Sequence, residues 1–357
     1  MSSIFNGGGI SFSVFGESHG SGIGIVVDGL PPGERIDLEK IGVFMARRAP
    51  GKDRTGTARK ESDIPEILSG LYNGKTTGTP LCAAIRNTGQ RSADYSGGVM
   101  TIRPGHADYT GYVRYGGNND IRGGGHFSGR LTAPLVFAGG VCGQILERRK
   151  IVTGAHIYSI AGVRDEPFDP VNIDSDTLRA VRTRYLPLLR PEKDGEFREV
   201  IDAAREASDS VGGIIECAVI GVPAGIGSPM LDGLENIIAR LVFAIPGVKG
   251  IEFGAGFDSA GMRGSENNDE FCVKDGVVLT KTNNHGGILG GISSGMPIVF
   301  RVAFKPTPSI ALPQKTVDVS DKTETIVKIK GRHDPCIVPR AVPVVESAVN
   351  IAVMSLM

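Results

Sequence analysis

The fold depends first on the stretch Leu131-Thr-Ala-Pro-Leu-Val-Phe-Ala-Gly-Gly-Val-Cys-Gly-Gln-Ile-Leu-Glu-Arg-Arg149. It is apolar on nearly every face of a helix, and it ends in cations, which a helix C-terminus favours. Because such a helix has no polar face to turn toward water, other elements have to cover it. The sequence therefore predicts a buried helix with further structure packed around it.

Four more helices are predicted by capping and periodicity. Asp37 is an N-cap residue in front of an amphipathic run at residues 38–48. Residues 231–244 and 342–356 are largely apolar and should be buried. Residues 192–208 are densely charged, so we expect that helix to lie on the surface.

Strand-like runs of β-branched and apolar residues recur along the whole chain. They occupy residues 22–28, 81–86, 151–160, 212–221, 250–256, 297–304 and 325–330. Strands and helices do not alternate in a regular βαβ order, which favours an α+β fold with helices packed between sheets. No repeat or linker divides the chain, so we expect residues 1–357 to form a single domain.

Composition excludes several classes of partner. Lys+Arg and Asp+Glu are both 39, so bulk charge favours neither nucleic acid nor a membrane surface. The uncharged run at residues 131–146 is too short and glycine-rich to span a membrane, and we expect no secretory signal. Five widely spaced cysteines form no C-x-x-C pair, which argues against a disulfide framework or a metal site. A cytoplasmic protein is expected.

Glycine accounts for 51 of the 357 residues and gathers beside charged and polar residues. Such clusters suit loops that approach a ligand closely, although tight turns explain part of them. Six cations fall within residues 47–60, either a solvated basic loop or an anion-binding loop. Arg122 and Arg130 bracket a glycine run, and Ser128 stands just before the buried helix, whose N-terminus suits an anion. Phosphate-loop and dinucleotide fingerprints are missing, so a P-loop or Rossmann site is disfavoured.

Three motifs combine histidine with glycine or with charged residues. They are Phe15-Gly-Glu-Ser-His19-Gly, Arg103-Pro-Gly-His106-Ala-Asp108 and Gly331-Arg332-His333-Asp334-Pro335-Cys336. A turn histidine that only bonds to backbone is the alternative for His19. An acid beside an arginine stays ionised, so Asp334 should act as a base or position Arg332. We expect Cys336 to pack in the interior rather than act as a nucleophile.

Two further segments, residues 283–295 and 305–309, offer Asn, Ser, Thr and Lys305 among flexible glycines and prolines. They suit a flat polar ring and a phosphate. The clusters are spread over the whole chain yet share one composition of Gly, Arg, His and small polar residues. This convergence predicts one large site for a polyanion and a second phosphorylated molecule.

In their order and spacing, these motifs resemble those of the chorismate synthase family from residue 11 to about residue 345. The resemblance implies a carbon–oxygen lyase that converts 5-enolpyruvylshikimate 3-phosphate to chorismate and phosphate. The reaction is a 1,4-anti elimination that needs reduced FMN, and it closes the shikimate pathway of aromatic amino acid biosynthesis. It further implies a layered β-α-β sandwich with buried helices between antiparallel sheets, and a homotetramer.

The resemblance also implies roles for particular residues. His19 would be the acid near the departing phosphate, His106 the partner of the reduced flavin ring, and Asp334 the residue that helps the flavin nitrogen take up the substrate proton. The arginines matching the family's grip on the substrate are Arg48, Arg54, Arg103, Arg130 and Arg332.

The flavin-binding positions implied are His126, Phe127, Ser128, Pro246, Gly247, Gly290, Lys305, Pro306, Thr307, Pro308, Ser309 and Arg332. His126-Phe127 stand where some members have Arg-Ser, and Pro246-Gly247 where some have Asn-Ala. Two alternatives remain open: a bifunctional form that reduces its flavin with NADPH, and a non-catalytic anion- or nucleotide-binding protein on the same scaffold. The intact His19, His106 and Asp334 argue against the second.

Overall fold

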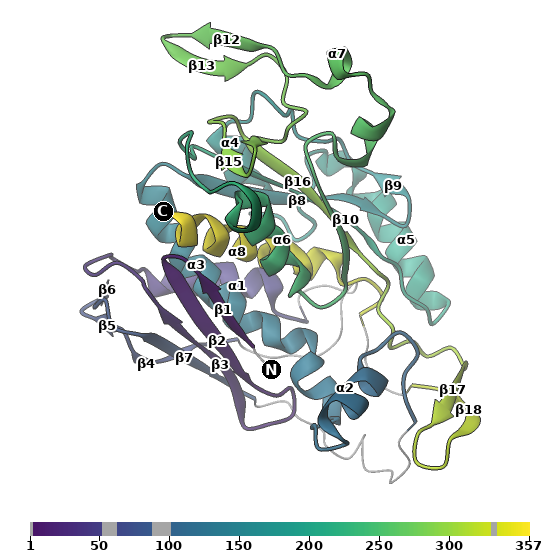
Figure 1. The fold of residues 1–357 in the computed structure, drawn as a ribbon. Coiled ribbons are helices and arrows are strands. Elements are labelled where there is room, and N and C mark those ends of the chain that lie inside the picture. The colour runs from purple at the N-terminus through teal and green to yellow at the C-terminus, as the bar shows by residue number, and fades with distance from the viewer. Residues whose placement is uncertain (1–2, 52–62, 88–100, 330–333) are drawn as a thin grey trace.

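The computed structural model describes residues 3–51, 63–87, 101–329 and 334–357 (Figure 1). Two five-stranded antiparallel sheets lie on either side of a layer of helices, with the first sheet below and the second above in Figure 1. The expected α+β fold, a layered sandwich with buried helices between antiparallel sheets, is confirmed.

The first sheet is built mostly from the N-terminal quarter of the chain. In spatial order it comprises β1 (Ile4–Gly7), β2 (Ile10–Gly16), β3 (Gly22–Asp28), β7 (Leu81–Arg86) and β4 (Glu66–Ser69). Successive side chains of a strand point to opposite faces, and Ile23, Ile25 and Val27 of β3 are all buried in the core. One face of this sheet therefore covers the helices.

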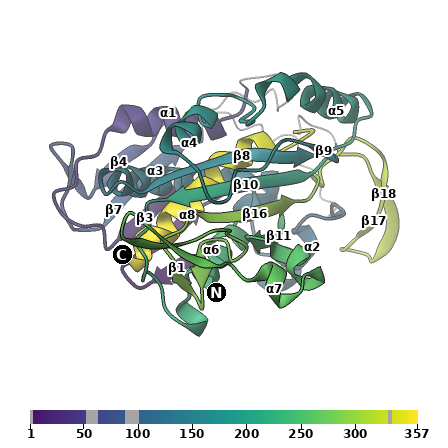
Figure 2. The same cartoon turned by 90° about the horizontal axis from the view of Figure 1, so that it is seen from above.

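The second sheet comes from the C-terminal part of the chain. Its spatial order is β11 (Val248–Phe253), β16 (Ile298–Phe304), β10 (Gly213–Ile220), β8 (Val152–Ile160) and β9 (Val163–Arg164). Seen from above in Figure 2, β8, β10 and β16 run side by side, with α8 in yellow crossing them. Four short hairpins complete the strands: β5 (Leu71–Tyr72) with β6 (Lys75–Thr76), β12 (Phe271–Lys274) with β13 (Val277–Thr280), β14 (Ile288–Leu289) with β15 (Ile292–Ser293), and β17 (Gln314–Asp318) with β18 (Thr323–Val327).

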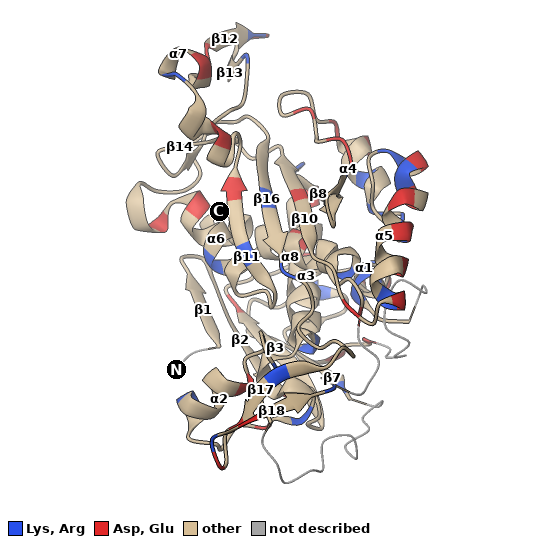
Figure 3. Cartoon of the chain, turned by 90° about the vertical axis from the view of Figure 1, so that its right-hand side faces the viewer, with Lys and Arg blue, Asp and Glu red and all other residues tan. Residues whose placement is uncertain are grey.

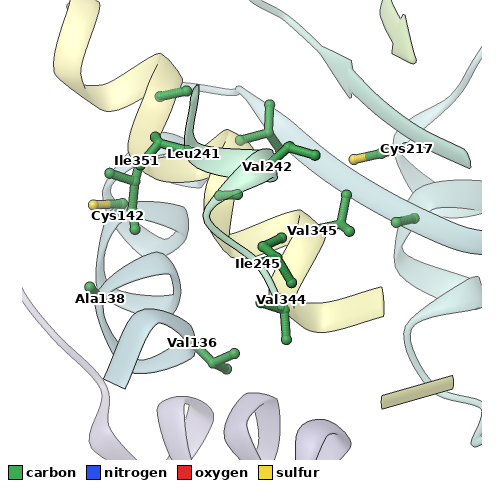
Figure 4. Close-up of a cluster of buried hydrophobic side chains, with 14 of the residues drawn as sticks. Val136, Ala138, Cys142, Cys217, Leu241, Val242, Ile245, Val344, Val345 and Ile351 are labelled. Atoms are coloured by element: carbon green, nitrogen blue, oxygen red, sulfur yellow. The ribbon is translucent and has the colours of Figure 1, made fainter. Parts of the chain in front are cut away.

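The helical layer consists of α1 (Leu38–Arg48), α3 (Thr132–Arg148), α6 (Leu234–Phe243) and α8 (Val338–Leu356). The two longest, α3 and α8, pack against each other, and each touches strands of both sheets. Figure 4 shows the contact: α3 contributes Val136, Ala138 and Cys142, α6 contributes Leu241 and Val242, and α8 contributes Val344, Val345 and Ile351. Burying an aliphatic side chain of this size is worth about 1.5–3 kcal/mol, so this layer holds the sheets together.

Close contact between α3 and α8 requires a residue without a side chain. A Cβ added at Gly139 of α3 would collide with Ser347 of α8. In the same region the fully buried carboxylate of Glu346 accepts two hydrogen bonds from Arg47 of α1 and one from the backbone N–H of Ala155 on β8. One α8 side chain thereby ties two helices and a sheet together.

The remaining helices lie outside this layer. They are α2 (Asp108–Tyr115), α4 (Ser175–Val181), α5 (Asp194–Glu206) and the short α7 (Gly264–Asn267). Leu178 of α4 and Phe168 cover Val152, Ala218 and Val299, which form a smaller core on the outer face of the second sheet. Figure 3 shows Lys, Arg, Asp and Glu crowded along α5, as expected of a charged surface helix. Within the described ranges, no helix combines the length and hydropathy needed to cross a membrane.

Most predicted elements are confirmed within a few residues, and three need correction. Helix α8 begins at Val338 rather than at residue 342, because a proline is tolerated in the first turn of a helix. Strand β11 covers Val248–Phe253 rather than residues 250–256, since Gly254 turns the chain with a φ of 54°. The strand predicted at residues 325–330 lies at Thr323–Val327 and pairs with β17, which the pattern missed. Strands β1, β2 and β4 were also missed.

Candidate active site

A glycine loop stands between the two histidines that the sequence singled out. It belongs to the turn η2 (Arg122–Phe127), where Gly123 and Gly124 have φ values of 60° and 88°. A Cβ on Gly123 would collide with the ring of His19, and one on Gly124 would lie 3.1 Å from Nε2 of His106. Only glycine combines this backbone with these contacts. The loop therefore brings His19 and His106 to its two sides.

The His19 turn follows β2 and is fixed from the neighbouring strand. The Asn87 side chain, just after β7, donates to the carbonyls of Glu17 and Gly20, both at 2.9 Å. The Ser18 backbone N–H donates to Gly125 O at 3.1 Å, which joins this turn to the glycine loop. His19 itself is 3% exposed. These bonds hold its ring against the loop rather than in solvent.

His106 belongs to a compact group with Arg103 and Asp108. Arg103 donates through Nε and Nη2 to the two oxygens of Asp108, each at 2.7 Å, and His106 Nδ1 lies 2.7 Å from Asp108 Oδ1. Burial alone would raise the pKa of Asp108, but hydrogen bonds from Arg103 and His106 hold it well below its ordinary value. Strand β17 supports this segment, since Ile102 N–H donates to Val317 O and the Thr316 hydroxyl to Ile102 O.

Two buried arginines share one carboxylate on the opposite side of the His19 turn. Arg48 donates to Asp63 Oδ2 at 2.5 Å, and Arg130 donates to Asp63 Oδ1. Burial would raise the pKa of Asp63, but the charges of Arg48 and Arg130 hold it below its ordinary value. Arg130 Nε also donates to Asn87 Oδ1 at 3.1 Å, which connects the pair to the His19 turn. These three side chains sum to a net charge of +1, which favours an anion.

Arg48 is further positioned by the start of α3 and by a third arginine. Its Nε donates to the hydroxyl of Thr132 at 3.0 Å and its Nη2 to Gly129 O at 3.1 Å. Arg340 Nε donates to Arg48 O at 2.9 Å, and Arg340 Nη1 donates to Asp334 at 2.5 Å. Among the described residues, Arg340 is thus a partner of Asp334, and Arg332, the partner that the sequence suggested, lies outside the described residues.

The segment 305–309 lies against the His106 group. Lys305 N–H donates to Gly247 O at 2.9 Å, and its ammonium donates to Gly105 O. Burial, and next the charge of Lys249, lower the pKa of Lys305. Arg103 Nη1 reaches the Ser309 hydroxyl at 3.4 Å. The Thr307 hydroxyl is buried and, in the part of the chain that the structure describes, has no hydrogen-bond partner.

Together these groups can bind an anion and move a proton beside it. Arginines supply directed positive charge, the two histidines flank one loop, and the unsatisfied Thr307 hydroxyl and Lys305 offer contacts to a second ligand. Within residues 3–51, 63–87, 101–329 and 334–357, no group of His, Cys, Asp and Glu has the arrangement of a metal site.

Comparison with known proteins agrees with this chemistry. A family model described as chorismate synthase matches residues 10–357. The chain belongs to the chorismate synthase family. The chorismate synthase of Thermococcus kodakarensis is 48% identical over 343 residues, covering 95% of this chain and 93% of that protein. The one from Methanocella arvoryzae is 49% identical over 352 residues, covering 98% and 93%. Chorismate synthase is a carbon–oxygen lyase, and this chain is an enzyme of that class.

A solved structure supports the fold. The chain superposes on a crystal structure of chorismate synthase with a TM-score of 0.76 at 29% sequence identity. The match covers 98% of this chain and 92% of the solved chain. The layered sandwich is therefore the architecture of a known chorismate synthase.

Most of the family positions named from the sequence gather in this region. Those that do are His19, Arg48, Arg103, His106, Ser128, Arg130, Pro246, Gly247, Lys305, Pro306, Thr307, Pro308, Ser309 and Asp334. Ser128 accepts a hydrogen bond from the Arg130 N–H and caps a short turn before α3. Arg54 and Arg332 lie outside the described residues.

Three family positions differ from the rest: Gly290 lies apart from the group, and the side chains of His126 and Phe127 contact other parts of the protein. Gly290 precedes β16 and Lys305 follows it, so a seven-residue strand, roughly 20 Å long, separates them. Both ring nitrogens of His126 contact protein groups, Nδ1 lying 2.8 Å from Gly16 O and Nε2 2.6 Å from the Ser3 hydroxyl. Phe127 packs on α2, with its ring 6.2 Å from that of Tyr115.

Four residues of the site were not assigned roles from the sequence: Asp63, Asn87, Asp108 and Arg340. Asp108 belongs to the motif Arg103-Pro-Gly-His106-Ala-Asp108, so its position two residues after His106 could have indicated a role in the site. Asp63, Asn87 and Arg340 stand alone among ordinary residues, and no local pattern marks them. Cys336, in contrast, is buried as expected, and burial raises the pKa of its thiol to about 12.

Proposed function

We propose that this chain converts 5-enolpyruvylshikimate 3-phosphate to chorismate and phosphate by 1,4-anti elimination in the presence of reduced FMN. The observation that carries the proposal is the glycine loop with His19 on one side and His106 on the other. Membership of the chorismate synthase family supports the reaction. The proposed site places two proton-handling side chains beside a group of buried arginines.

The arginines would bind the substrate, which carries two carboxylates and a phosphate. Arg48 and Arg130 are held in place by Asp63, so little side-chain freedom remains to be lost on binding. Preorganised guanidinium groups orient an anion and stabilise the charge that develops on a leaving phosphate. We assign Arg54 and Arg332 to the same grip because of the family motif alone.

The two histidines would divide the proton handling. His19 lies on the turn that Asn87 joins to Arg130, so we assign it as the acid near the departing phosphate. Lys305 contacts Gly105 and Ser309 contacts Arg103, both in the His106 segment, so we assign His106 to the cofactor side of the site. Asp334, held by Arg340, is assigned to the uptake of the proton that leaves the substrate ring.

The segment 305–309 and its neighbours fit a phosphorylated flavin. The Thr307 hydroxyl is a buried polar atom left without a described partner, and such an atom favours a ligand that satisfies it. Lys305, Thr307 and Ser309 would hold the cofactor. When bound, reduced FMN supplies electron density to the elimination. NADPH as its reductant stays a prediction of the family resemblance.

We also propose that residues 1–357 form one catalytic domain, assemble as a homotetramer and work in the cytoplasm. The shared helical layer supports one domain, because α3 and α8 touch both sheets. Exposed apolar side chains on the β12–β13 hairpin, among them Phe271 and Val273, support self-association. The five free cysteines suit a reducing compartment. Light scattering tests the assembly, and a monomer at working concentration contradicts it.

The experiment is turnover of the enolpyruvyl substrate under strict exclusion of oxygen. With reduced FMN, chorismate and phosphate should form in equal amounts while the flavin is not consumed. The control uses oxidised FMN without any reductant, and no product is expected. Product formation in that control, or no turnover with reduced FMN, would overturn the proposal.

A further inference from the structure

We propose that Asp108 is a positioning residue that keeps a proton on Nδ1 of His106 and so makes Nε2, which faces the glycine loop, the nitrogen that exchanges protons during the reaction. The inference rests on the proposed function, since it assigns how one histidine of that reaction is prepared. Asp108 itself contacts His106 and Arg103 rather than the loop.

The Asp108 carboxylate is engaged on both oxygens. Oδ2 accepts from Arg103 Nε at 2.7 Å and from the Arg103 backbone N–H at 3.0 Å, and Oδ1 accepts from Arg103 Nη2 at 2.7 Å. His106 Nδ1 lies 2.7 Å from the same Oδ1. Because Asp108 is the first residue of α2, the positive end of that helix adds to the stabilisation of its charge. The carboxylate is thereby held in one orientation.

The two contacts of His106 Nδ1 select its protonation state. An ionised carboxylate only accepts hydrogen bonds, so Nδ1 must donate to Asp108. Arg103 Nη2 lies 3.2 Å from Nδ1, and it would donate to that nitrogen only if Nδ1 carried no proton. In that state the lone pair of Nδ1 would face an oxygen anion at 2.7 Å, which is repulsive. The shorter contact therefore decides for a proton on Nδ1.

With Nδ1 protonated, Nε2 carries the free lone pair. It faces Gly124, where an added Cβ would lie 3.1 Å away. Accepting one proton at Nε2 yields an imidazolium whose charge Asp108 stabilises, and releasing that proton restores the starting form. Within the described residues, the charged groups that contact His106 are Arg103 and Asp108, and Lys305 reaches the carbonyl of the preceding residue, Gly105.

The first test is the Asp108→Asn variant, assayed as the full chain with reduced FMN under anaerobic conditions. Removing the acid partner of a catalytic histidine costs up to about 10⁴-fold in kcat in enzymes with an Asp–His pair, so we expect a fall of roughly 10²- to 10⁴-fold. KM should change by less than about threefold. The pH–rate profile should change as well, because the charge beside His106 is lost.

A double-mutant cycle separates positioning from general support of the fold. If Asp108 acts through His106, Asp108→Asn should lower kcat little further in a His106→Gln background. A multiplied loss in the double variant would overturn the proposal. Asp174→Asn is the control, since Asp174 also stands at a helix start and accepts backbone N–H groups, but it caps α4, on the outer face. It should keep wild-type kcat and pH profile.

Asp108→Glu keeps the charge and carries the test if the Asn variant does not fold. Its pH–rate profile should match that of the wild type while kcat falls, because the oxygen moves but the charge remains. A pH–rate profile changed as in the Asn variant contradicts the proposal. The wild-type enzyme, measured in the same assay, separates failure of the proposed function from failure of this inference. If the wild type does not turn over, the proposed function is wrong. If the wild type turns over and Asp108→Asn is unaffected, only the inference about Asp108 is wrong.

Discussion

His106 and His156 are both paired with carboxylates, yet they lie in opposite situations. His156, on β8, is fully buried, with Nδ1 3.3 Å from Asp165 and Nε2 3.0 Å from Glu216. The ring of Phe168 packs edge-on against it at 4.6 Å. His106 has one carboxylate at Nδ1, and its Nε2 faces the glycine loop of the proposed site.

The difference shows how to tell a structural histidine from a chemical one in this protein. Glu216 continues a row of charges across the second sheet, since Arg301 on β16 donates to it at 2.9 Å and stacks over Tyr158 at 4.3 Å. Both nitrogens of His156 are held inside this row, so no position is left for a substrate. Both histidines have a carboxylate partner at Nδ1. They differ at Nε2, which contacts Glu216 in His156 and faces the glycine loop in His106.

The largest expected effect tests whether His106 takes part in the reaction. His106→Ala should lower turnover by roughly ten- to ten-thousand-fold, the usual range for a general acid or base. Thermal stability and binding of oxidised FMN should stay close to wild type. Steady-state kinetics and flavin titration measure this, and near-normal turnover at saturating ligands would refute the role.

The next largest effect tests whether His156 stabilises the fold. His156→Ala leaves Asp165 and Glu216 buried without their shared partner, and breaking a buried ion pair costs about 3–5 kcal/mol. Urea unfolding should show this loss, while the folded fraction keeps its kcat and KM. A normal unfolding midpoint with a fallen kcat would reverse the assignment of the two histidines.

Two neighbouring arginines extend the comparison with a matched pair. Arg48→Ala removes a charge-assisted contact from the anion group and should weaken substrate binding by about 1.5–3 kcal/mol, with a smaller effect on FMN affinity. Arg47→Ala breaks the pair with buried Glu346 and should lower stability, as Arg48→Ala also does through buried Asp63, but in Arg47→Ala KM should stay normal. Ligand titration and urea unfolding of both variants check this, and a loss confined to flavin affinity in Arg48→Ala contradicts it.

The smallest effect is the pH dependence of stability. Burial alone would lower the pKa of His156, but hydrogen bonds and charges from Asp165 and Glu216 raise it above the ordinary value of about 6.5. The folded state then holds a proton that the unfolded chain has released. This stabilisation is fully present below about pH 6.5 and is lost as the pH rises through the raised folded-state pKa. Unfolding free energies of wild type and His156→Gln across this window should converge with rising pH, and parallel curves contradict the assignment.

The sequence by itself determined the kinds of element and most of the loops. A helix that is apolar on nearly every face, such as residues 131–149, has to be covered by other structure, so it predicted the helical layer before any partner was known. Runs of Gly with His or Arg are local signals, and they marked the segments of His19 and His106, which the fold brings to the two sides of the glycine loop. Strand β1, of four residues, was not predicted because a short strand is specified by its partners more than by its own pattern.

Only the tertiary structure decided which charges meet. Arg47 pairs with Glu346, 299 residues away, and Asp63 joins Arg48 to Arg130 across two separate loops. Nothing local distinguishes these acids from exposed ones, because their energy comes from burial and geometry created by the packed sheets. That Gly290 and Lys305, which lie before and after β16, contact the same flavin stays a prediction of the family motif.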